Sequence, residues 1–149
     1  MDAVTYPDAR VAEFIEQNLV PVRVRFDDPL AEEFGLSWTP MLVTLDPQGK
    51  EHQRTVGFLA PEELIPSLML GIAKSHFECE EFDDALSMLD TLIASYPGSA
   101  AAPEAVFLRG VAGYKKTHSA QPLKAAYEKL HARYPQSEWA KRAAPYRLL

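Results

Sequence analysis

The chain has 149 residues, of which 47% are apolar, so it can form one ordinary domain or two small ones and is too apolar for an intrinsically disordered protein. Its net charge is −6 and its basic residues are scattered among acidic ones, which excludes the basic patch of a nucleic-acid-binding protein. No apolar run approaches the roughly 18 residues of a membrane span, and Met1-Asp2-Ala3 begins no signal peptide, so a cytoplasmic protein without membrane contact is expected.

The first elements along the chain are a helix, a strand and a short helix. Residues 7–19 place apolar side chains at helical spacing behind Asp8, a typical N-cap residue. In VPVRVRF, residues 20–26, apolar residues alternate with others, which predicts a strand with one buried and one exposed face. Asp28 is the next N-cap candidate, and Pro29 suits the first position of the short helix that follows.

A β-hairpin is predicted next. MLVTL, residues 41–45, is the most apolar strand candidate, and the following Asp-Pro-Gln-Gly is a typical turn sequence. A second strand is expected over residues 51–58, with Gly57 as a candidate bulge. The two strands are expected to pair antiparallel, and only helices are expected from Pro61 onward.

The second half shows amphipathic helices and an internal repeat. Apolar patterns within residues 82–96, 106–114 and 123–134 predict three helices. SYPGS and RYPQS, whose prolines Pro97 and Pro135 are 38 residues apart, each follow one helix and precede another. A helix–turn–helix unit of about 34 residues is typical of tetratricopeptide repeats, which this half resembles. The closing SEWAKRAAPY is expected to form a capping helix.

The first half has a recognisable order of elements: helix, strand 20–26, short helix, Thr39-Pro40, strand 41–45, a second strand and a helix. This order resembles the C-terminal two-thirds of a thioredoxin-like domain, and the resemblance covers about residues 1–70. In that family the Thr-Pro bond is cis, and the residue before proline pairs with a bound peptide. The resemblance therefore implies a peptide-facing loop formed by Trp38, Thr39 and Pro40.

The Cys-x-x-Cys motif of that family is absent from this chain. The motif and the strand before it would precede Met1, which resembles a methionine that follows the motif in one subgroup. Cys79 cannot substitute, because nearby carboxylates disfavour its thiolate and it has no second thiol. We therefore expect a structural or surface thiol at Cys79 and no catalytic residue, metal or cofactor. Alternatively, Met1 is internal to a longer reading frame with a Cys-x-x-Cys or selenocysteine-containing motif upstream, and the full product is a thiol–disulfide oxidoreductase acting in redox homeostasis.

Loss of the strand that carries the motif also has a physical cost. In the parent fold this strand lies between the equivalents of residues 20–26 and 41–45, so its loss leaves unpaired backbone groups on both. The two flanking strands could pair directly, a second copy could exchange elements, or the domain could be partly disordered. We favour direct pairing or a homodimer through an exposed strand 20–26.

The expected fold class is thus α/β plus α. An incomplete thioredoxin-like domain over residues 1–66 precedes tetratricopeptide-like helical repeats with a C-terminal capping helix over residues 67–149. The expected function is non-catalytic binding of a protein or an extended peptide. The repeat aromatics are mostly expected in the core, with a peptide groove as the alternative for Phe107, Tyr114 and Tyr127.

Overall fold

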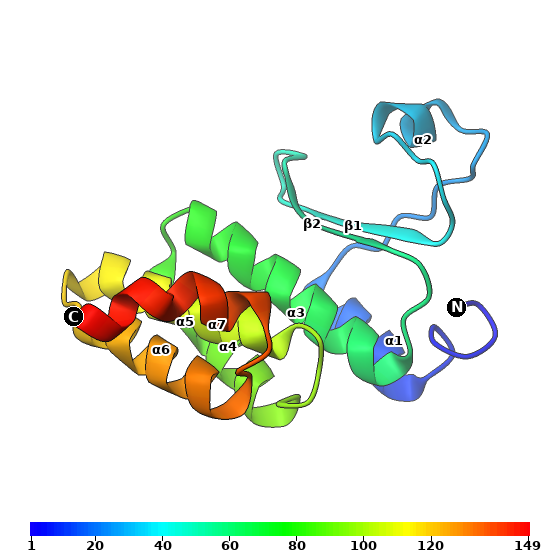
Figure 1. Ribbon diagram of the computed structural model, residues 1–149. Helices are drawn as coiled ribbons and strands as arrows, with labels where there is room; N and C mark the ends of the chain where they lie inside the picture. Colours follow the sequence, from blue (N-terminus) through cyan, green and yellow to red (C-terminus); the bar gives the residue numbers. More distant parts are fainter.

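The computed structural model describes residues 1–149 as a mostly helical molecule with one two-stranded antiparallel sheet (Figure 1). None of its helices combines the length and the apolar character that crossing a membrane requires. The elements, in chain order, are α1 (Ala9–Asn18), α2 (Pro29–Glu33), β1 (Met41–Leu45), β2 (Glu51–Val56), α3 (Pro61–Glu78), α4 (Phe82–Ser95), α5 (Ala102–Thr117), α6 (Gln121–Arg133), α7 (Glu138–Ala143) and a 3₁₀ helix (Ala144–Leu148).

The two predicted N-caps of the first half are confirmed. The Asp8 carboxylate accepts a hydrogen bond from Arg10 N, and the Asp28 carboxylate accepts one from Leu30 N, each at 2.9 Å. These bonds satisfy backbone N–H groups that have no partner inside the first turn. Pro29 stands at the start of α2, where its missing N–H costs nothing.

The hairpin pairs antiparallel as predicted, with Met41 opposite Val56 and Thr44 opposite Gln53. The predicted bulge at Gly57 is wrong, because the register shift lies between Thr44 and Leu45, beside the turn. Gly57 instead continues the ladder beyond β2, since its N–H donates to Pro40 O at 2.8 Å. The Asp46 carboxylate tightens the turn itself by accepting hydrogen bonds from Gln48 N and Lys50 N, each at 2.9 Å.

The hairpin lies across α3, and Gly71 makes this close approach possible. A Cβ at Gly71 would lie 2.7 Å from Thr44 Oγ1 and 3.0 Å from Gln53 Cβ, closer than van der Waals contact allows. Thr44 is buried at this contact, and Leu42 packs against the core from the same strand. The helix α2 lies beyond the hairpin on the side away from α3 (Figure 1).

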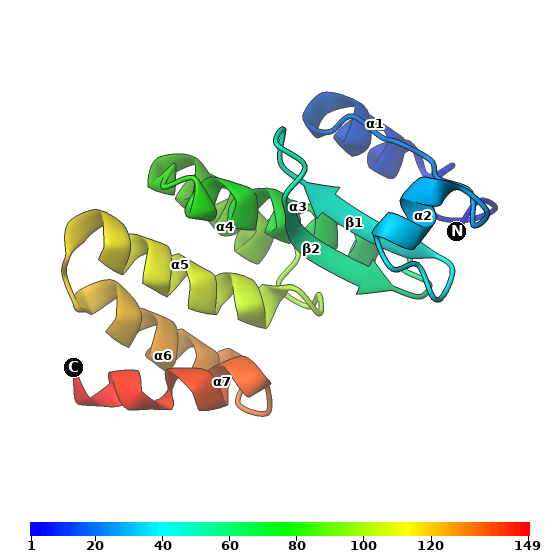
Figure 2. The same cartoon turned by 90° about the horizontal axis from the view of Figure 1, so that it is seen from above.

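One continuous core serves both halves of the chain. It contains Val11 from α1, Leu64 and Leu70 from α3, and Leu89 and Leu130 from the later helices. The predicted domain boundary at residues 66/67 falls inside α3, which is a single helix with Pro66 in its interior. The helix α3 therefore belongs to both halves, packing against the hairpin on one side and against α4 on the other (Figure 2).

The internal repeat predicted from SYPGS and RYPQS appears as two copies of the same turn. After α4, Ser99 Oγ donates to Tyr96 O at 2.9 Å, and after α6, Ser137 Oγ donates to Tyr134 O at 2.8 Å. Tyr96 and Tyr134 have nearly the same backbone angles, φ −129 and ψ 52 against φ −133 and ψ 48. The three predicted helices and the capping helix are likewise present as α4, α5, α6 and α7.

Candidate functional site

The loop before β1 presents a large apolar side chain to solvent. Trp38 is 67% exposed, and the Thr39–Pro40 peptide bond is cis, as the sequence resemblance implied. The hydrogen bond from Gly57 N to Pro40 O joins this loop to the end of β2. Val56 and Phe58, which flank Gly57, are also more than half exposed. One end of the hairpin therefore carries exposed apolar side chains from both of its strands.

The outer edge of β1 has no strand beside it. In an antiparallel ladder, alternate residues point their N–H and C=O groups toward the partner strand. The pairing of Pro40 with Gly57 and the register that follows direct the backbone of Leu42 and Thr44 toward β2. Met41 and Val43 therefore direct their backbone groups to the opposite edge, where no other part of the chain forms a backbone hydrogen bond with them.

On the β2 side, the sheet faces the turn that precedes α5. A cleft of about 200 Å³ separates β2 from the turn that precedes α5. Across this turn, the Glu63 carboxylate accepts a hydrogen bond from Ala100 N at 3.0 Å. The turn before α5 thus lies close to α3 beside β2, whereas no other strand lies beside the outer edge of β1 (Figure 2).

The prediction of a strand at residues 20–26 is wrong. The segment is outside the sheet, and residues 20–24 form no backbone hydrogen bond within the protein. Val20, Val22 and Phe26, predicted to face the core, are 91%, 75% and 66% exposed. The alternating pattern fits a strand, but a strand also needs a neighbour, and none lies beside this segment. Direct pairing of the segment with β1 in one chain, one of the expected repairs, does not occur.

The exposed segment passes the hairpin on the β1 side as it connects α1 to α2 (Figure 2). Its two arginines form ion pairs with nearby aspartates, Arg23 with Asp2 at 2.9 Å and Arg25 with Asp27 at 3.0 Å. All four side chains are mostly exposed, so these pairs contribute little to stability. They do leave the segment with balanced charge.

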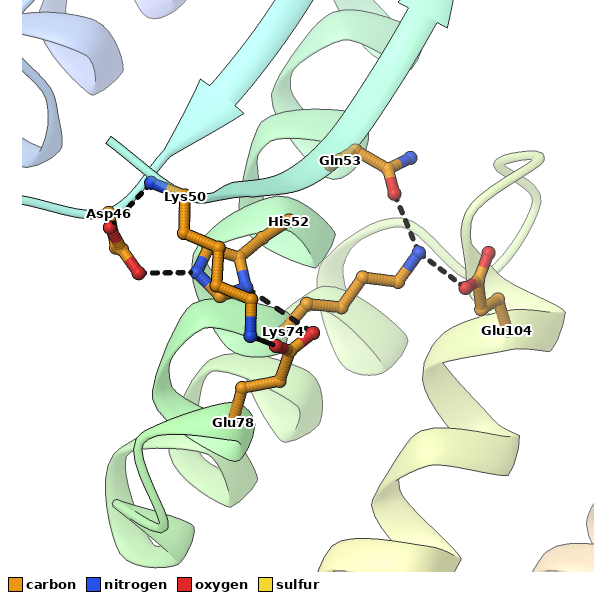
Figure 3. A network of polar contacts seen from close by, with 7 residues as sticks. All are labelled: Asp46, Lys50, His52, Gln53, Lys74, Glu78 and Glu104. Atoms are coloured by element: carbon orange, nitrogen blue, oxygen red, sulfur yellow. Dashed lines mark hydrogen bonds and ion pairs between the residues drawn. The ribbon is translucent and has the colours of Figure 1, made fainter. Parts of the chain in front are cut away.

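The turn end of the hairpin is attached to α3 by a buried histidine (Figure 3). The side chain of His52 is only 1% exposed, and its Nε2 lies 2.9 Å from Asp46 Oδ2. His52 Nδ1 has no hydrogen bond and lies 3.4 Å from Glu78 Oε1, in the last turn of α3. Lys50 reaches the same Glu78 carboxylate from the hairpin turn.

Hydrogen bonds to these carboxylates shift their protonation. The bond to His52, together with the one that Asp46 accepts from Lys50 N, lowers the pKa of the Asp46 carboxyl from its ordinary value. The Lys50 ammonium lowers the pKa of Glu78, with a smaller contribution from His52. Both carboxylates are therefore held charged where the turn meets α3. The sequence did not indicate this cluster, because Glu78 lies 28 residues after Lys50 and nothing in the sequence shows that α3 meets the hairpin turn.

A second polar link joins the hairpin to the repeat half (Figure 3). Lys74 Nζ donates to Gln53 Oε1 at 2.6 Å and pairs with Glu104 Oε1 at 2.5 Å. The side chains of Lys74 and Glu104 are about four-fifths buried, so this pair is shielded from solvent. The three residues connect β2, α3 and α5, which holds the hairpin in place.

The remaining residues singled out in the sequence do not gather at this edge. Cys79 is an exposed free thiol at the C-terminal end of α3. The Trp38–Pro40 loop lies near the other end of that helix, because Pro40 O accepts its hydrogen bond from Gly57 N, four residues before α3 begins at Pro61. An 18-residue helix is about 27 Å long, so the thiol lies far from the loop. His76 Nδ1 instead approaches the exposed carboxylates of Glu81 and Asp84, with ligand atoms within 4.8 Å of one another.

The three aromatic residues proposed for a repeat groove have different surroundings. The Phe107 ring lies 5.2 Å from that of Trp139 and 5.9 Å from that of Tyr146, so the C-terminal helices cover it. Tyr127 is half-buried and stacks on His131, while Tyr114 is 40% exposed. Phe107 is thus part of the contact between α5 and the capping helices.

Comparison with known proteins adds no relative, since no family model, no curated protein and no solved structure matches this chain.

Proposed function

We propose that this chain is a non-catalytic protein-binding module that takes up an extended polypeptide segment along the outer edge of β1, next to the Trp38–Pro40 loop. The observation that carries the proposal is the free edge itself. Met41 and Val43 offer unpaired N–H and C=O groups that the backbone of any extended segment can satisfy.

The surroundings of the edge suit such a ligand. Backbone hydrogen bonds would align the bound segment, and exposed apolar side chains at the loop would contact its side chains. Trp38 is the largest of these, and tryptophan is enriched among residues that dominate binding energy at protein interfaces. The links from His52 and Lys74 to α3 and α5 hold the edge in a fixed position, which reduces the entropy lost on binding.

The same proposal assigns a thioredoxin-like ancestry to the first half and a tetratricopeptide-like one to the second. The order of helix, hairpin and α3 supports the former, and the repeated turn around Tyr96 and Tyr134 supports the latter. Thiol–disulfide exchange by this chain is not part of the proposal, because such exchange generally needs two thiols and the single Cys79 lies far from the loop.

The test uses reduced, carboxymethylated α-lactalbumin, an unfolded polypeptide without free thiols, and follows the amide resonances of the chain on titration. We expect shifts at Met41, Val43 and the Trp38 loop. Trp38→Ala should weaken binding about tenfold or more. Leu148→Ala is the matched control, because Leu148 is an exposed apolar residue at the other end of the chain.

Two results would contradict the proposal. One is binding that shifts only resonances of α5 and α6, or no binding at all. The other is catalytic reduction of insulin disulfides by the 149-residue chain, which would show an enzyme rather than a binding module.

A further inference from the structure

We propose that the occupant of the β1 edge in the free protein is the segment of residues 20–26 from a second copy of this chain. The exchange is reciprocal, so each copy lends its segment and receives one. The inference rests on the proposed function, because the same edge binds both the second copy and a foreign segment. The two occupants therefore exclude each other, and self-association keeps the edge closed until a foreign segment displaces the second copy.

The segment of residues 20–26 can supply the neighbouring strand that the β1 edge lacks. It is extended, its backbone groups at residues 20–24 are free, and its apolar side chains alternate at strand spacing. Val22 at 75% exposure and Val20 at 91% have no packing partner within one copy. Moving such side chains out of water is favourable, and only an added surface can do so here.

In the observed fold of a single copy, the segment and the β1 edge are not paired. The segment is fixed at its start by α1, whose Val11 is fully buried in the core. At its end it continues into α2, and the Arg54 guanidinium of β2 donates a hydrogen bond to Phe34 O just after that helix. Between these attachments the chain passes the hairpin without forming a backbone hydrogen bond. The segment of another copy has the same attachments within its own fold, but that copy can approach the β1 edge as a separate body.

The chemistry of the two surfaces favours a second copy over an unrelated peptide. In a strand, Val22, Val24 and Phe26 would share one side of the segment, as Met41, Val43 and Leu45 share one side of β1. The segment brings no unbalanced charge, because Arg23 and Arg25 are paired with aspartates of their own copy. Each copy has one such edge and one such segment, so a two-fold dimer satisfies both and stops at two copies.

The decisive test compares two double variants of the segment. V22P/R23P removes two consecutive backbone N–H groups, which point to opposite sides of a strand, so one of the two lost groups must belong to the pairing. V22A/R23A removes the same side chains and keeps both N–H groups. Proline suits an extended, unbonded backbone, so V22P/R23P should keep the fold of each copy.

The mass of each protein is measured by light scattering from about 1 µM to about 1 mM. We expect the wild type and V22A/R23A to reach the mass of two copies, while the dissociation constant of V22P/R23P is at least about tenfold higher than that of V22A/R23A. Helical circular dichroism and protected amides at Leu42 and Thr44 must remain in both variants, which shows that the fold and the hairpin persist.

A wild type that keeps the mass of one copy throughout, or a dimer that V22P/R23P does not weaken, overturns the inference. Titration with carboxymethylated α-lactalbumin distinguishes a failure of the homodimer inference from a failure of the proposed function. Binding at Met41 and Val43 by a protein that never dimerises would refute only the homodimer. A dimer that V22P/R23P dissociates without exposing a binding site would refute only the uptake of foreign segments.

Discussion

The repeat half and the hairpin region differ in how completely they bury their apolar side chains and pair their backbone polar groups. In the repeat half, every helix from α3 to α6 is packed against a neighbour, and α7 with the 3₁₀ helix covers the end of the array. In the hairpin region, one face of the sheet is packed on α3, while the β1 edge and residues 20–26 remain unsatisfied.

The difference is the reason that the proposed binding is placed at the β1 edge and not in the helical array. Leu89 and Leu130 in the helical array are fully buried, and the equivalent turns at Tyr96 and Tyr134 satisfy their own polar groups. Free backbone groups and exposed valines occur instead around β1. Stability and binding are therefore assigned to different parts of the chain, and variants in the two regions should behave differently.

The largest contrast is expected between two apolar truncations. Leu130→Ala removes a fully buried side chain from the core and should lower the free energy of unfolding by about 2–5 kcal/mol. Val22→Ala removes an exposed side chain, and in dilute solution its effect should stay within about 0.5 kcal/mol. Urea unfolding of both variants at low protein concentration measures the contrast, and similar losses would remove it.

A smaller effect is expected where the two regions meet. Gly71→Ala places a Cβ against Thr44, so the hairpin must shift on α3 at a cost of about 1–3 kcal/mol. Gly98→Ala is the control, because a Cβ there meets open space. Amide exchange should show that Gly71→Ala loosens β1 and β2 more than α5 and α6. Equal loosening of all elements would contradict the attachment described here.

The turn end of the hairpin should show a pH dependence. Because the folded pKa of Asp46 is lowered, its contribution to stability is fully present above the unfolded value of about 3.9 and is lost as the pH falls through the folded value. Asp46→Asn should therefore destabilise the protein at neutral pH by less than Gly71→Ala does, and the difference from wild type should shrink below about pH 4. A difference that is constant from neutral to acidic pH would exclude the role given to the carboxylate.

The smallest effect concerns the repeated turn. Tyr134→Phe deletes the hydroxyl that donates to Pro97 O at 2.6 Å and should cost about 0.5–1.5 kcal/mol. Tyr114→Phe is the matched control, since no hydrogen bond of the Tyr114 hydroxyl is present. Thermal unfolding of the two variants tests whether this link between the two turns is real, and equal midpoints would argue against it.

Much of the local structure could be predicted because it depends on neighbouring residues. Asp8 and Asp28 cap helices through bonds to residues two positions on, and Pro97 and Pro135 mark turns that their own sequence specifies. The candidate site depends on distant residues instead. Alternation at residues 20–26 shows which side chains share a face, but it cannot show whether a neighbouring strand exists.

The contacts that hold the hairpin of the candidate site on α3 could not be predicted from the sequence either. His52 meets Asp46 and Glu78 only because the hairpin crosses the last turns of α3. The available signal was Gly71, a glycine inside an apolar helix, which indicates close approach by another element without naming it.

The most direct test of the central claim is amide exchange within β1, measured residue by residue at low and high protein concentration. Leu42 and Thr44 direct their N–H groups toward β2 and should be protected at both concentrations. Met41 and Val43 should exchange rapidly at low concentration and become protected at high concentration, when a second copy covers the edge. If Met41 and Val43 exchange at the same rate at both concentrations, the β1 edge does not receive a second copy.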